Sequence, residues 1–379
     1  MNYIERSIEK KILDSLKLNK VILVYGARRV GKTEMIKHLV GKYSEKYLWL
    51  NGDDMDHIAA LEHRSRSNYQ RLIGDAKLLV IDEAQQIPEI GLKLKLMIDT
   101  LDDLKIIATG SSAFDLNNQV GEPLVGRKRE FYLYPIAQME LFNTEDYLET
   151  IANLNDRLVF GTYPELVGLN GEMQKIEYLK DQINSYLLKD ILSFEGIKKR
   201  DKMVNLLKII SFRVGSEISM ESIGRQLQIS KNTVDRYLDL FSKVFIIYKV
   251  KGFSRNLDNE ITKKSKWYFF DNGIRNAIIS SFNPIELRND IGKLWENYLI
   301  SERIKYQSYN RLYIDNYFWR NKNRQEIDWV EDRDNKLYAY EFKWNPKVKV
   351  AMPSNWKKGY PDSNFVIVNR DNYLDFINP

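Results

Sequence analysis

Residues 26–33 read Gly-Ala-Arg-Arg-Val-Gly-Lys-Thr, which fits the pattern G-x-x-x-x-G-K-[ST]. The apolar run of residues 21–25 before them predicts a buried strand, and residues 34–40 after them have helical spacing. In this context the glycines let backbone N–H groups curl around an anion, and the helix N-terminus adds partial positive charge. A glycine-containing turn that matches by chance is the alternative. The pattern predicts a phosphate-binding loop made of Gly26, Ala27, Arg28, Arg29, Val30, Gly31, Lys32 and Thr33.

Two side chains of this loop predict the cofactors. Lys32 would reach the β- and γ-phosphates of a nucleoside triphosphate, and the Thr33 hydroxyl would bind Mg²⁺. We therefore expect ATP and Mg²⁺ to bind where the helix begins.

A second motif completes the expected chemistry. Residues 78–83 read Leu-Leu-Val-Ile-Asp-Glu, an apolar strand that ends in two acids. Asp82 would hold Mg²⁺, directly or through water, and Glu83 would orient and deprotonate the attacking water. An Asp-Glu pair after a strand also fits a helix cap with an acidic first turn. Because the strand with Asp82 and Glu83 accompanies a phosphate loop, nucleotide binding is favoured over a helix cap. Lys32 and Glu83 are the predicted catalytic residues.

Three further candidates lie beside later strands. Thr109 and Ser111 follow the predicted strand of residues 106–109, and ligands of open parallel sheets bind at the carboxyl ends of strands. These hydroxyls would sense the γ-phosphate, although a turn that caps the next helix explains them equally well. Arg127 precedes the fifth predicted strand, residues 130–134. It would be a catalytic arginine finger, in its own subunit or in a neighbouring one.

The composition is that of a folded protein without disulfides. Of the 379 residues, 44% are hydrophobic and 29% are charged, and no apolar run has the length of about 18 residues that predicts a membrane span. The chain has no cysteine, and its three histidines show no metal-ligand spacing. The first residues also lack the layout of a signal peptide. We therefore expect a cytoplasmic protein that does not enter the membrane.

Positive charge is concentrated in one segment of the sequence. Residues 186–266 carry 17 Lys and Arg against 9 Asp and Glu, whereas the rest of the chain holds 41 basic and 43 acidic residues. A clustered basic region suggests a phosphate-backbone partner, but a solvated charged surface would look the same. DNA is therefore one candidate partner, beside a protein partner and further copies of the chain in a homo-oligomer.

The pattern of residues 218–250 predicts a helix-turn-helix. Ser230 would cap the second helix, residues 231–243, whose buried stripe includes Val234 and Leu238. The start and outer face of that helix are the positions that face a major groove in this motif, and they hold Lys231, Asn232, Thr233 and Arg236. The strand of residues 245–250 and the basic stretch 263–266 would form a wing. A winged helix that binds DNA and one that only packs or contacts a partner both remain open.

Two alternating patterns near the C-terminus gather carboxylates. Glu341 and Lys343 would share one face of a strand, and Glu326, Asp328 and Val330 would share one face of another. Adjacent strands would then bring Asp328, Glu341 and Lys343 into one cluster.

This spacing resembles the active site of restriction-type nucleases, in which carboxylates hold Mg²⁺ and a lysine steadies the charge on phosphate. Asp328 and Glu341 are the candidate metal ligands. Glu296, on the preceding helix, and Lys343 would be further members of the same site. A solvated strand edge with a cross-strand Lys–Glu pair is the alternative.

The motifs together resemble a large prokaryotic family of AAA-type ATPases with a C-terminal domain of unknown function. The resemblance covers nearly the whole chain and rests on the two phosphate motifs, on Ala-Thr-Gly-Ser-Ser at 108–112, Tyr-Pro-Ile-Ala-Gln-Met-Glu at 134–140, Phe-Gly-Thr-Tyr-Pro at 160–164, Lys-Trp-Tyr-Phe-Phe-Asp-Asn-Gly at 266–273 and Trp-Glu-Asn at 295–297. It implies an α/β fold built on a parallel P-loop sheet. The implied domains are a P-loop ATPase core (1–140), a helical lid (141–212), a winged helix (213–275) and a restriction-endonuclease-like domain (276–379). In related ATPases the proline of a Gly-x-Pro motif contacts the nucleotide, but the spacing at Gly161 and Pro164 is one residue longer.

The sequence thus predicts an ATP-hydrolysing protein that couples its nucleotide state to DNA or to a partner through the winged helix. Two rivals remain. One is a metal-dependent DNA nuclease that ATP gates, and the other is a switch that holds ATP and recruits nucleic acid or protein without being an enzyme.

Overall fold

The computed structural model describes residues 3–111, 123–187, 200–254 and 265–379. The chain divides into two compact units. The first comprises Met1–Ile136 and Lys243–Phe245, and the second comprises Ala137–Ser242 and Ile246–Pro379. Within the described ranges, no helix combines the length and the apolar character needed to cross a membrane.

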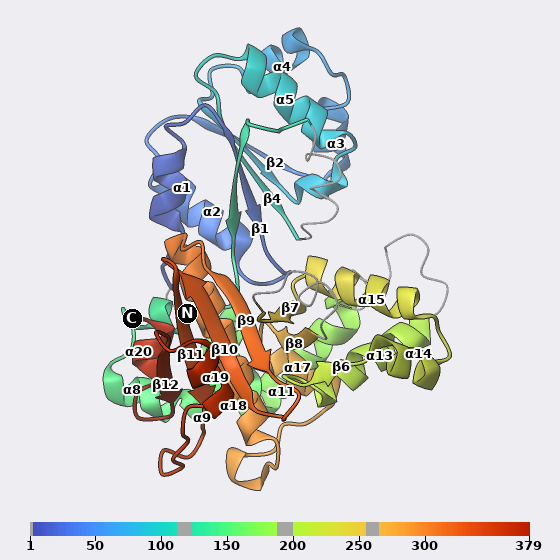
Figure 1. The fold of residues 1–379 in the computed structure, drawn as a ribbon. Coiled ribbons are helices and arrows are strands. Elements are labelled where there is room, and N and C mark those ends of the chain that lie inside the picture. Colours follow the sequence, from blue (N-terminus) through green and yellow to red (C-terminus); the bar gives the residue numbers. More distant parts are fainter. Residues whose placement is uncertain (1–2, 112–122, 188–199, 255–264) are drawn as a thin grey trace. The chain divides into compact units, whose positions relative to one another are not determined.

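The first unit is built on a five-stranded parallel sheet in the order β2-β3-β4-β1-β5 (Figure 1). The strands are β1 (Val21–Tyr25), β2 (Tyr47–Asn51), β3 (Leu78–Asp82), β4 (Lys105–Gly110) and β5 (Lys128–Tyr132). Every residue of β1 and β3 is buried, as expected of central strands covered on both faces. The predicted parallel P-loop sheet is confirmed, and the strands predicted at residues 21–25, 78–83 and 106–109 correspond to β1, β3 and β4.

Helices cover both faces of this sheet. They are α1 (Glu9–Ser15), α2 (Lys32–Gly41), α3 (Met55–Ala60), α4 (Arg66–Ile73), the 3₁₀ turn η1 (Ala84–Gln86) and α5 (Ile90–Thr100). α1 packs against α2 on one face, and α4 packs against α5 on the other (Figure 1). Because β3, β4 and β1 are parallel neighbours in the sheet, their carboxyl ends lie side by side at one edge of it.

The second unit begins with short helices. These are α7 (Gln138–Leu141), α8 (Tyr147–Ala152), α9 (Leu154–Phe160), α10 (Pro164–Val167), α11 (Glu172–Asp181), the π-helix η2 (Gln182–Leu187) and α13 (Arg200–Phe212). The predicted lid, residues 141–212, falls in this unit, where α9 and α11 pack against α17 (Asn272–Ile278). Asp271, the N-cap of α17, accepts hydrogen bonds from the backbone N–H groups of Ile274 and Thr162.

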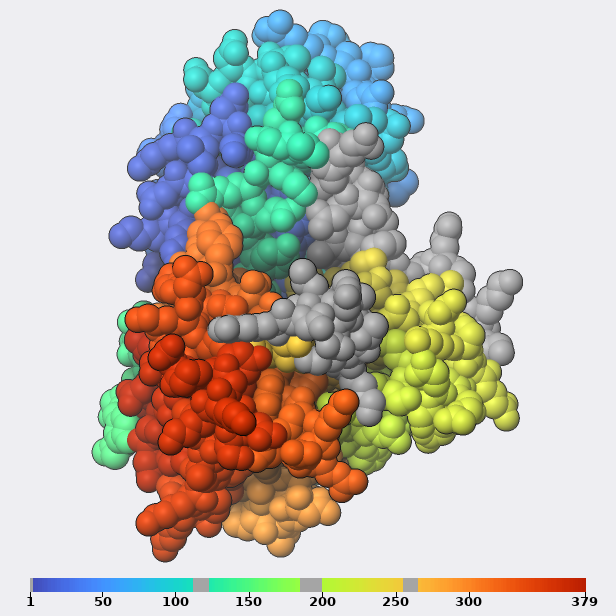
Figure 2. Space-filling model, viewed as in Figure 1, coloured from blue at the N-terminus to red at the C-terminus, as the bar shows by residue number. Residues whose placement is uncertain are grey.

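A seven-stranded mixed sheet forms the core of the second unit, in the order β12-β11-β10-β9-β7-β8-β6. Its strands are β6 (Glu217–Ile218), β7 (Ile247–Gly252), β8 (Ser265–Phe269), β9 (Asp315–Arg320), β10 (Glu326–Arg333), β11 (Lys336–Phe342) and β12 (Asn364–Val368). The remaining helices are α14 (Met220–Leu227), α15 (Lys231–Lys243), the 3₁₀ turn η3 (Ile285–Leu287), α18 (Ile291–Asn310), α19 (Ser354–Gly359) and α20 (Tyr373–Ile377). In the space-filling view, the yellow-green residues around α14 and α15 and the orange-to-red C-terminal residues occupy separate parts of the surface of this unit (Figure 2).

The strands expected in a wing and those expected in a nuclease-like domain belong to this one sheet. β7 pairs in parallel with β9, with Lys251 opposite Tyr317 and Gly252 opposite Phe318. The predicted division at residue 275 therefore does not separate two sheets.

Candidate nucleotide site and carboxylate cluster

The phosphate-loop residues connect the end of β1 to the first residue of α2. Gly31 has a φ of 94° and Arg29 a φ of 62°, so the chain passes through the left-handed region before the helix begins. A Cβ at Gly26 would lie 2.2 Å from the carbonyl oxygen of Leu133, so only glycine fits there. Val30 is buried, whereas Arg28 is half-buried and Arg29 is exposed. The loop is thus shaped by its glycines and fastened by one apolar side chain.

Lys32 lies beneath this loop and is held by backbone oxygens. Its side chain is buried, and its ammonium donates to the carbonyls of Gly26, at 2.8 Å, and Ala27, at 3.0 Å. The positive charge therefore sits within the loop, in contact with carbonyl groups that an anion can replace.

Asp82 joins three elements at the carboxyl edge of the sheet. It accepts a hydrogen bond from the Thr33 hydroxyl at 2.7 Å and another from the Thr109 hydroxyl at 2.5 Å. Thr33 stands on α2, Asp82 ends β3 and Thr109 lies on β4. Three residues that the sequence assigned to Mg²⁺ binding or phosphate sensing thus lie in contact.

Glu83 follows in a left-handed conformation, with a φ of 48°. Its backbone N–H donates to the Thr109 hydroxyl at 3.2 Å. Its carboxylate accepts from the Gln85 amide at 2.5 Å, and the same amide nitrogen lies 3.1 Å from the Ser111 hydroxyl. Ser111 is therefore connected to Glu83 through Gln85. Gln85 was not among the predicted site residues, although an amide two residues after the predicted base was a usable signal.

Arg6 fastens the loop from the N-terminal segment. It is buried, and its guanidinium donates to the carbonyls of Val30, at 2.8 Å, and Tyr134, at 2.7 Å. No local sequence pattern pointed to Arg6, because the contact to Tyr134 spans 128 residues.

Arg127 lies at the opposite edge of the sheet from the loop. β5 runs parallel to β1 with Lys128 opposite Val21, so the residue before β5 lies at the amino ends of the strands. Five strand residues, or about 16 Å, separate this edge from the loop. Arg127 instead pairs with Asp99 at 2.6 Å. The prediction of a finger acting on its own subunit's loop is therefore corrected, and a role in a neighbouring subunit stays a prediction.

In the second unit, the predicted carboxylates gather around two lysines. β10 and β11 are neighbours, as predicted, and their pairing is antiparallel. The Asp328 carboxylate accepts from the backbone N–H of Phe342 at 2.9 Å. Lys343 donates to Glu341 at 2.7 Å. We call Glu296, Glu326, Asp328, Glu341, Lys266 and Lys343 the carboxylate cluster.

Lys266 lies inside this cluster and not on a wing. It is buried on β8, and its ammonium lies 2.5 Å from a Glu326 oxygen and 3.6 Å from a Glu296 oxygen. The predicted basic wing stretch, residues 263–266, is thus corrected at Lys266, because β8 pairs on both sides and turns this side chain inward. Lys263 and Lys264 lie outside the described residues.

A β-bulge changes the predicted face of β10. The register against β9 shifts between Ile327 and Val330, and both residues belong to one buried apolar cluster. Strict alternation would put them on opposite faces, so the predicted common face of Glu326, Asp328 and Val330 is wrong for Val330.

Burial disturbs the ionisation of the cluster. It raises the pKa of Glu296 to about 7, with the negative charge of Asp328 adding to the effect and Lys266 opposing it. Burial also raises the pKa of Asp328 and of Glu341. Burial thus favours the protonated forms of these three carboxyl groups.

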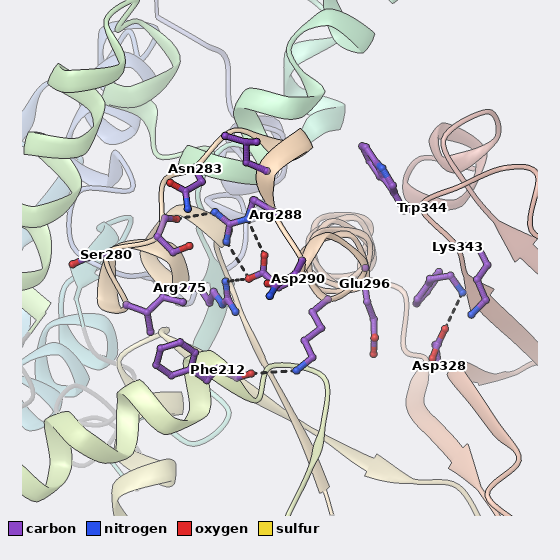
Figure 3. A pocket seen from close by; sticks show the side chains of 17 residues that line it. Phe212, Arg275, Ser280, Asn283, Arg288, Asp290, Glu296, Asp328, Lys343 and Trp344 are labelled. Atoms are coloured by element: carbon purple, nitrogen blue, oxygen red, sulfur yellow. Dashed lines mark hydrogen bonds and ion pairs between the residues drawn. The ribbon is translucent and has the colours of Figure 1, made fainter.

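A cavity of about 900 Å³ adjoins the cluster. Figure 3 shows that Glu296 lies between two groups of residues that line the cavity. Asp328, Lys343 and Trp344 are on one side of it, and Arg288 and Asp290 are on the other. In the described part of the chain, no three His, Asp or Glu side chains are placed so that they could hold one metal ion. The predicted set of Asp328, Glu341 and Glu296 thus lies close together without forming a ready three-ligand site.

The predicted DNA-facing helix α15 carries both signs of charge. Lys231, Asn232 and Arg236 are exposed as predicted, but Asp235 and Asp239 are exposed on the same helix. Lys231 also forms an ion pair with Glu221 at 2.7 Å. This surface therefore has no excess of positive charge for a phosphate backbone.

Comparison with known proteins supports the first unit's chemistry. Residues 18–142 match a family model described as an AAA domain, and residues 151–284 and 291–378 match two domains of unknown function, DUF8612 and DUF4143. The Walker-type ATPase paby2304 of Pyrococcus abyssi has a similar fold, with a TM-score of 0.53 at 17% identity over 73% of this chain and 96% of that one. The N-terminal part of the chain is thus similar to AAA-type ATPase domains in sequence and in fold.

Relatives in sequence are uncharacterized proteins. MJ1544 of Methanocaldococcus jannaschii is 25% identical over 354 residues, which cover 88% of this chain and 76% of the relative. A protein of Haemophilus influenzae is 25% identical over 323 residues, covering 78% of this chain and 74% of its own length. These relatives match most of the chain but name no activity.

Proposed function

We propose that this protein binds ATP with Mg²⁺ at the loop of residues 26–33 and hydrolyses it. The observation that supports this most strongly is the contact of Asp82 with the hydroxyls of Thr33 and Thr109, directly beside the loop and Lys32.

The residues present fit a magnesium ion. Carboxylate and hydroxyl oxygens are the ligands that Mg²⁺ prefers, so Thr33 and Asp82 would hold it, directly or through water. The ion would neutralise charge on the phosphate oxygens.

The chain's own groups would do the rest. The loop's backbone N–H groups and Lys32 would bind the phosphates, and Glu83 would accept the proton of the attacking water. Thr109 would position the turn after β3, because its hydroxyl contacts both Asp82 and the backbone of Glu83.

Phosphate release tests this proposal. We expect Mg²⁺-dependent release from ATP that falls at least about 100-fold in Lys32→Ala, since one preorganised charge contact contributes that much in comparable sites. Lys37→Ala is the matched control, because Lys37 is an exposed lysine on the same helix and pairs with Glu34. Release that persists in Lys32→Ala would overturn the assignment.

We propose further that the nucleotide state is coupled to a partner through the helices of the second unit. The succession α13, β6, α14, α15, β7 and β8 is the element order of a winged helix, and Ile223 on α14 and Val234 and Leu238 on α15 are buried. The acids on α15 favour a protein partner over DNA at this helix. A pull-down with wild type and an Arg236→Glu variant in the presence of ATP and of ADP tests this, and nucleotide-independent capture contradicts it.

A metal-dependent nuclease is the second candidate, supported by the gathering of Glu296, Asp328 and Lys343 beside the cavity. Nicking of plasmid DNA with Mn²⁺ or Mg²⁺ that is lost in Asp328→Ala supports it. Asp362→Ala, which changes an exposed acid of the same unit, is the control. Absence of nicking with either metal rejects it. A switch that binds ATP without hydrolysing it would show binding by calorimetry with no phosphate release.

A further inference from the structure

A second concentration of positive charge lies near the C-terminus, outside the segment that the charge count identified. Residues 343–361 contain five lysines and no Asp or Glu. Residues 319–325 contain three basic residues and again no acid. The two segments are separated in sequence by both strands of the β10–β11 hairpin.

The fold holds these segments together. Residues 321–325 form the turn between β9 and β10, closed by the bond from the Gln325 N–H to the Asn321 side chain at 3.0 Å. The Gln325 side chain donates to the Ser354 hydroxyl at 3.1 Å and accepts from the Asn355 N–H at 3.3 Å. The turn is therefore hydrogen-bonded to the start of α19.

Buried aromatic packing fixes α19 in the same place. Trp356 is fully buried, and its ring lies 5.3 Å from that of Trp319 on β9. Met352 and Tyr360, on either side of α19, pack against the same apolar cluster. Trp356, Met352 and Tyr360 thus face inward, whereas the lysines of this region and Val348 are exposed.

Six basic side chains remain exposed on these segments, and we call them the basic rim. They are Lys322, Arg324, Lys347, Lys349, Lys357 and Lys358. Among the residues that the structure describes, none of the six forms an ion pair, in contrast to Arg320, which pairs with Glu217 and Glu326, and Lys343, which pairs with Glu341. Uncompensated like charges repel one another, so an anionic partner would stabilise this arrangement.

We propose that the basic rim binds the phosphate backbone of double-stranded nucleic acid. Lys343, which lines the cavity, lies four residues before Lys347 in the sequence, so one segment of the rim leads away from the cavity. A backbone held by the rim would pass beside a polar cavity, which suits a polymer that extends beyond the basic patch. A lipid surface fits less well, since Trp356, Met352 and Tyr360 are packed in the core and not available to enter a bilayer.

The test measures binding of a 25-base-pair duplex by fluorescence anisotropy over a series of salt concentrations. The variants Lys322→Gln/Arg324→Gln and Lys357→Gln/Lys358→Gln each remove two charges from one segment of the rim. Each phosphate contact contributes about 0.9 to the slope of log affinity against log salt. We therefore expect each pair to reduce the slope by about 1.8 and to weaken binding at low salt.

Three further arms make the result decisive. Lys10→Gln/Lys17→Gln, which alters exposed lysines at α1, should leave the slope unchanged. Lys32→Ala should keep duplex binding, so that a failed ATPase assignment is distinguished from a failed rim. Thermal unfolding of the rim variants should match that of the wild type.

Several outcomes would overturn the proposal. They are no duplex binding by the wild type at low salt, an unchanged slope in both rim pairs, and loss of binding only in an α15 pair, Lys231→Gln/Arg236→Gln. Preferential binding to vesicles that contain phosphatidylserine would assign the rim to a membrane surface instead.

Discussion

The phosphate-loop site and the carboxylate cluster both bury lysine and acid side chains, but they hold these charges differently. At the loop, the Lys32 ammonium donates to the carbonyl oxygens of Gly26 and Ala27, and Asp82 accepts from the hydroxyls of Thr33 and Thr109. In the cluster, Lys266 lies directly against Glu326 and near Glu296. A charged ligand can replace neutral partners at the loop at little cost, whereas at the cluster it must compete with an ion pair already in place.

The two sites should therefore respond differently to the loss of a charge. Substitution at the loop should change hydrolysis more than stability, and substitution in the cluster should change stability first. Six of the seven tryptophans lie in the second unit, so tryptophan fluorescence reports mainly on unfolding of the unit that holds the cluster.

The largest expected effect is on catalysis by Glu83. Glu83→Gln keeps the shape and the hydrogen bond to Gln85 but cannot accept a proton, so kcat should fall about 100- to 10,000-fold. ATP affinity, measured by calorimetry, should change little, because the loop and Lys32 are intact. Glu34→Gln, on the exposed side of α2, is the control. A variant that retains wild-type kcat would show that another group activates water.

Removal of the cluster's buried lysine should have the next largest effect. Lys266→Met leaves Glu326 and Glu296 without their ammonium, and breaking a buried ion pair on one side costs about 3–5 kcal/mol. Urea unfolding followed by tryptophan fluorescence measures the loss. Lys249→Met, on the neighbouring strand β7 and exposed, should cost much less. Equal stability of the two variants would mean that the cluster does not depend on Lys266.

Glu296 should make the stability of the second unit depend on pH, and Asp328 and Glu341, whose pKa values are also raised by burial, should act in the same direction. The folded pKa of Glu296, about 7, lies above the unfolded value of 4.5, so the folded state binds this proton more tightly. The contribution to stability is complete below pH 4.5 and is lost as the pH rises through 7. At 1.36 kcal/mol per pKa unit, about 2–3 kcal/mol should disappear between pH 5 and 8.

Glu296→Gln should flatten that profile, since glutamine does not titrate and can still accept from Tyr268. Urea unfolding of wild type and variant at several pH values makes the comparison. Parallel profiles for the two proteins would assign the pH dependence to other groups.

The same contrast explains what the sequence could predict. The loop of residues 26–33 and the acids Asp82 and Glu83 are contiguous motifs attached to strand ends, so their local patterns were enough to predict that they would meet. Lys266 was misplaced because its neighbours in sequence are basic, whereas its neighbours in space come from α18 and β10. Such contacts depend on strand order, which no local pattern contains.

Two other differences have specific physical causes. Val330 lies on an unexpected face because a bulge adds a residue to β10, and alternation alone cannot reveal a bulge. Arg127 could have been placed correctly, because a residue before a parallel strand lies at the edge opposite to a loop that follows one. The contact of Arg6 with the phosphate loop could not be predicted from the sequence, since it depends on packing between distant segments.

The smallest expected effect concerns Gln85, which links Glu83 to Ser111. Gln85→Ala should lower kcat about tenfold, the size of about one net hydrogen bond of 1.4 kcal/mol, with little change in KM. Gln86→Ala, at the exposed neighbouring position, should leave kcat unchanged. Because Gln85 would act through the carboxylate of Glu83, Gln85→Ala should have almost no further effect in a Glu83→Gln background, whereas an independent structural role would add its full loss. Additive losses in the double variant would therefore remove Gln85 from the catalytic arrangement and leave the loop site with Glu83 positioned by the backbone contact to Thr109 alone.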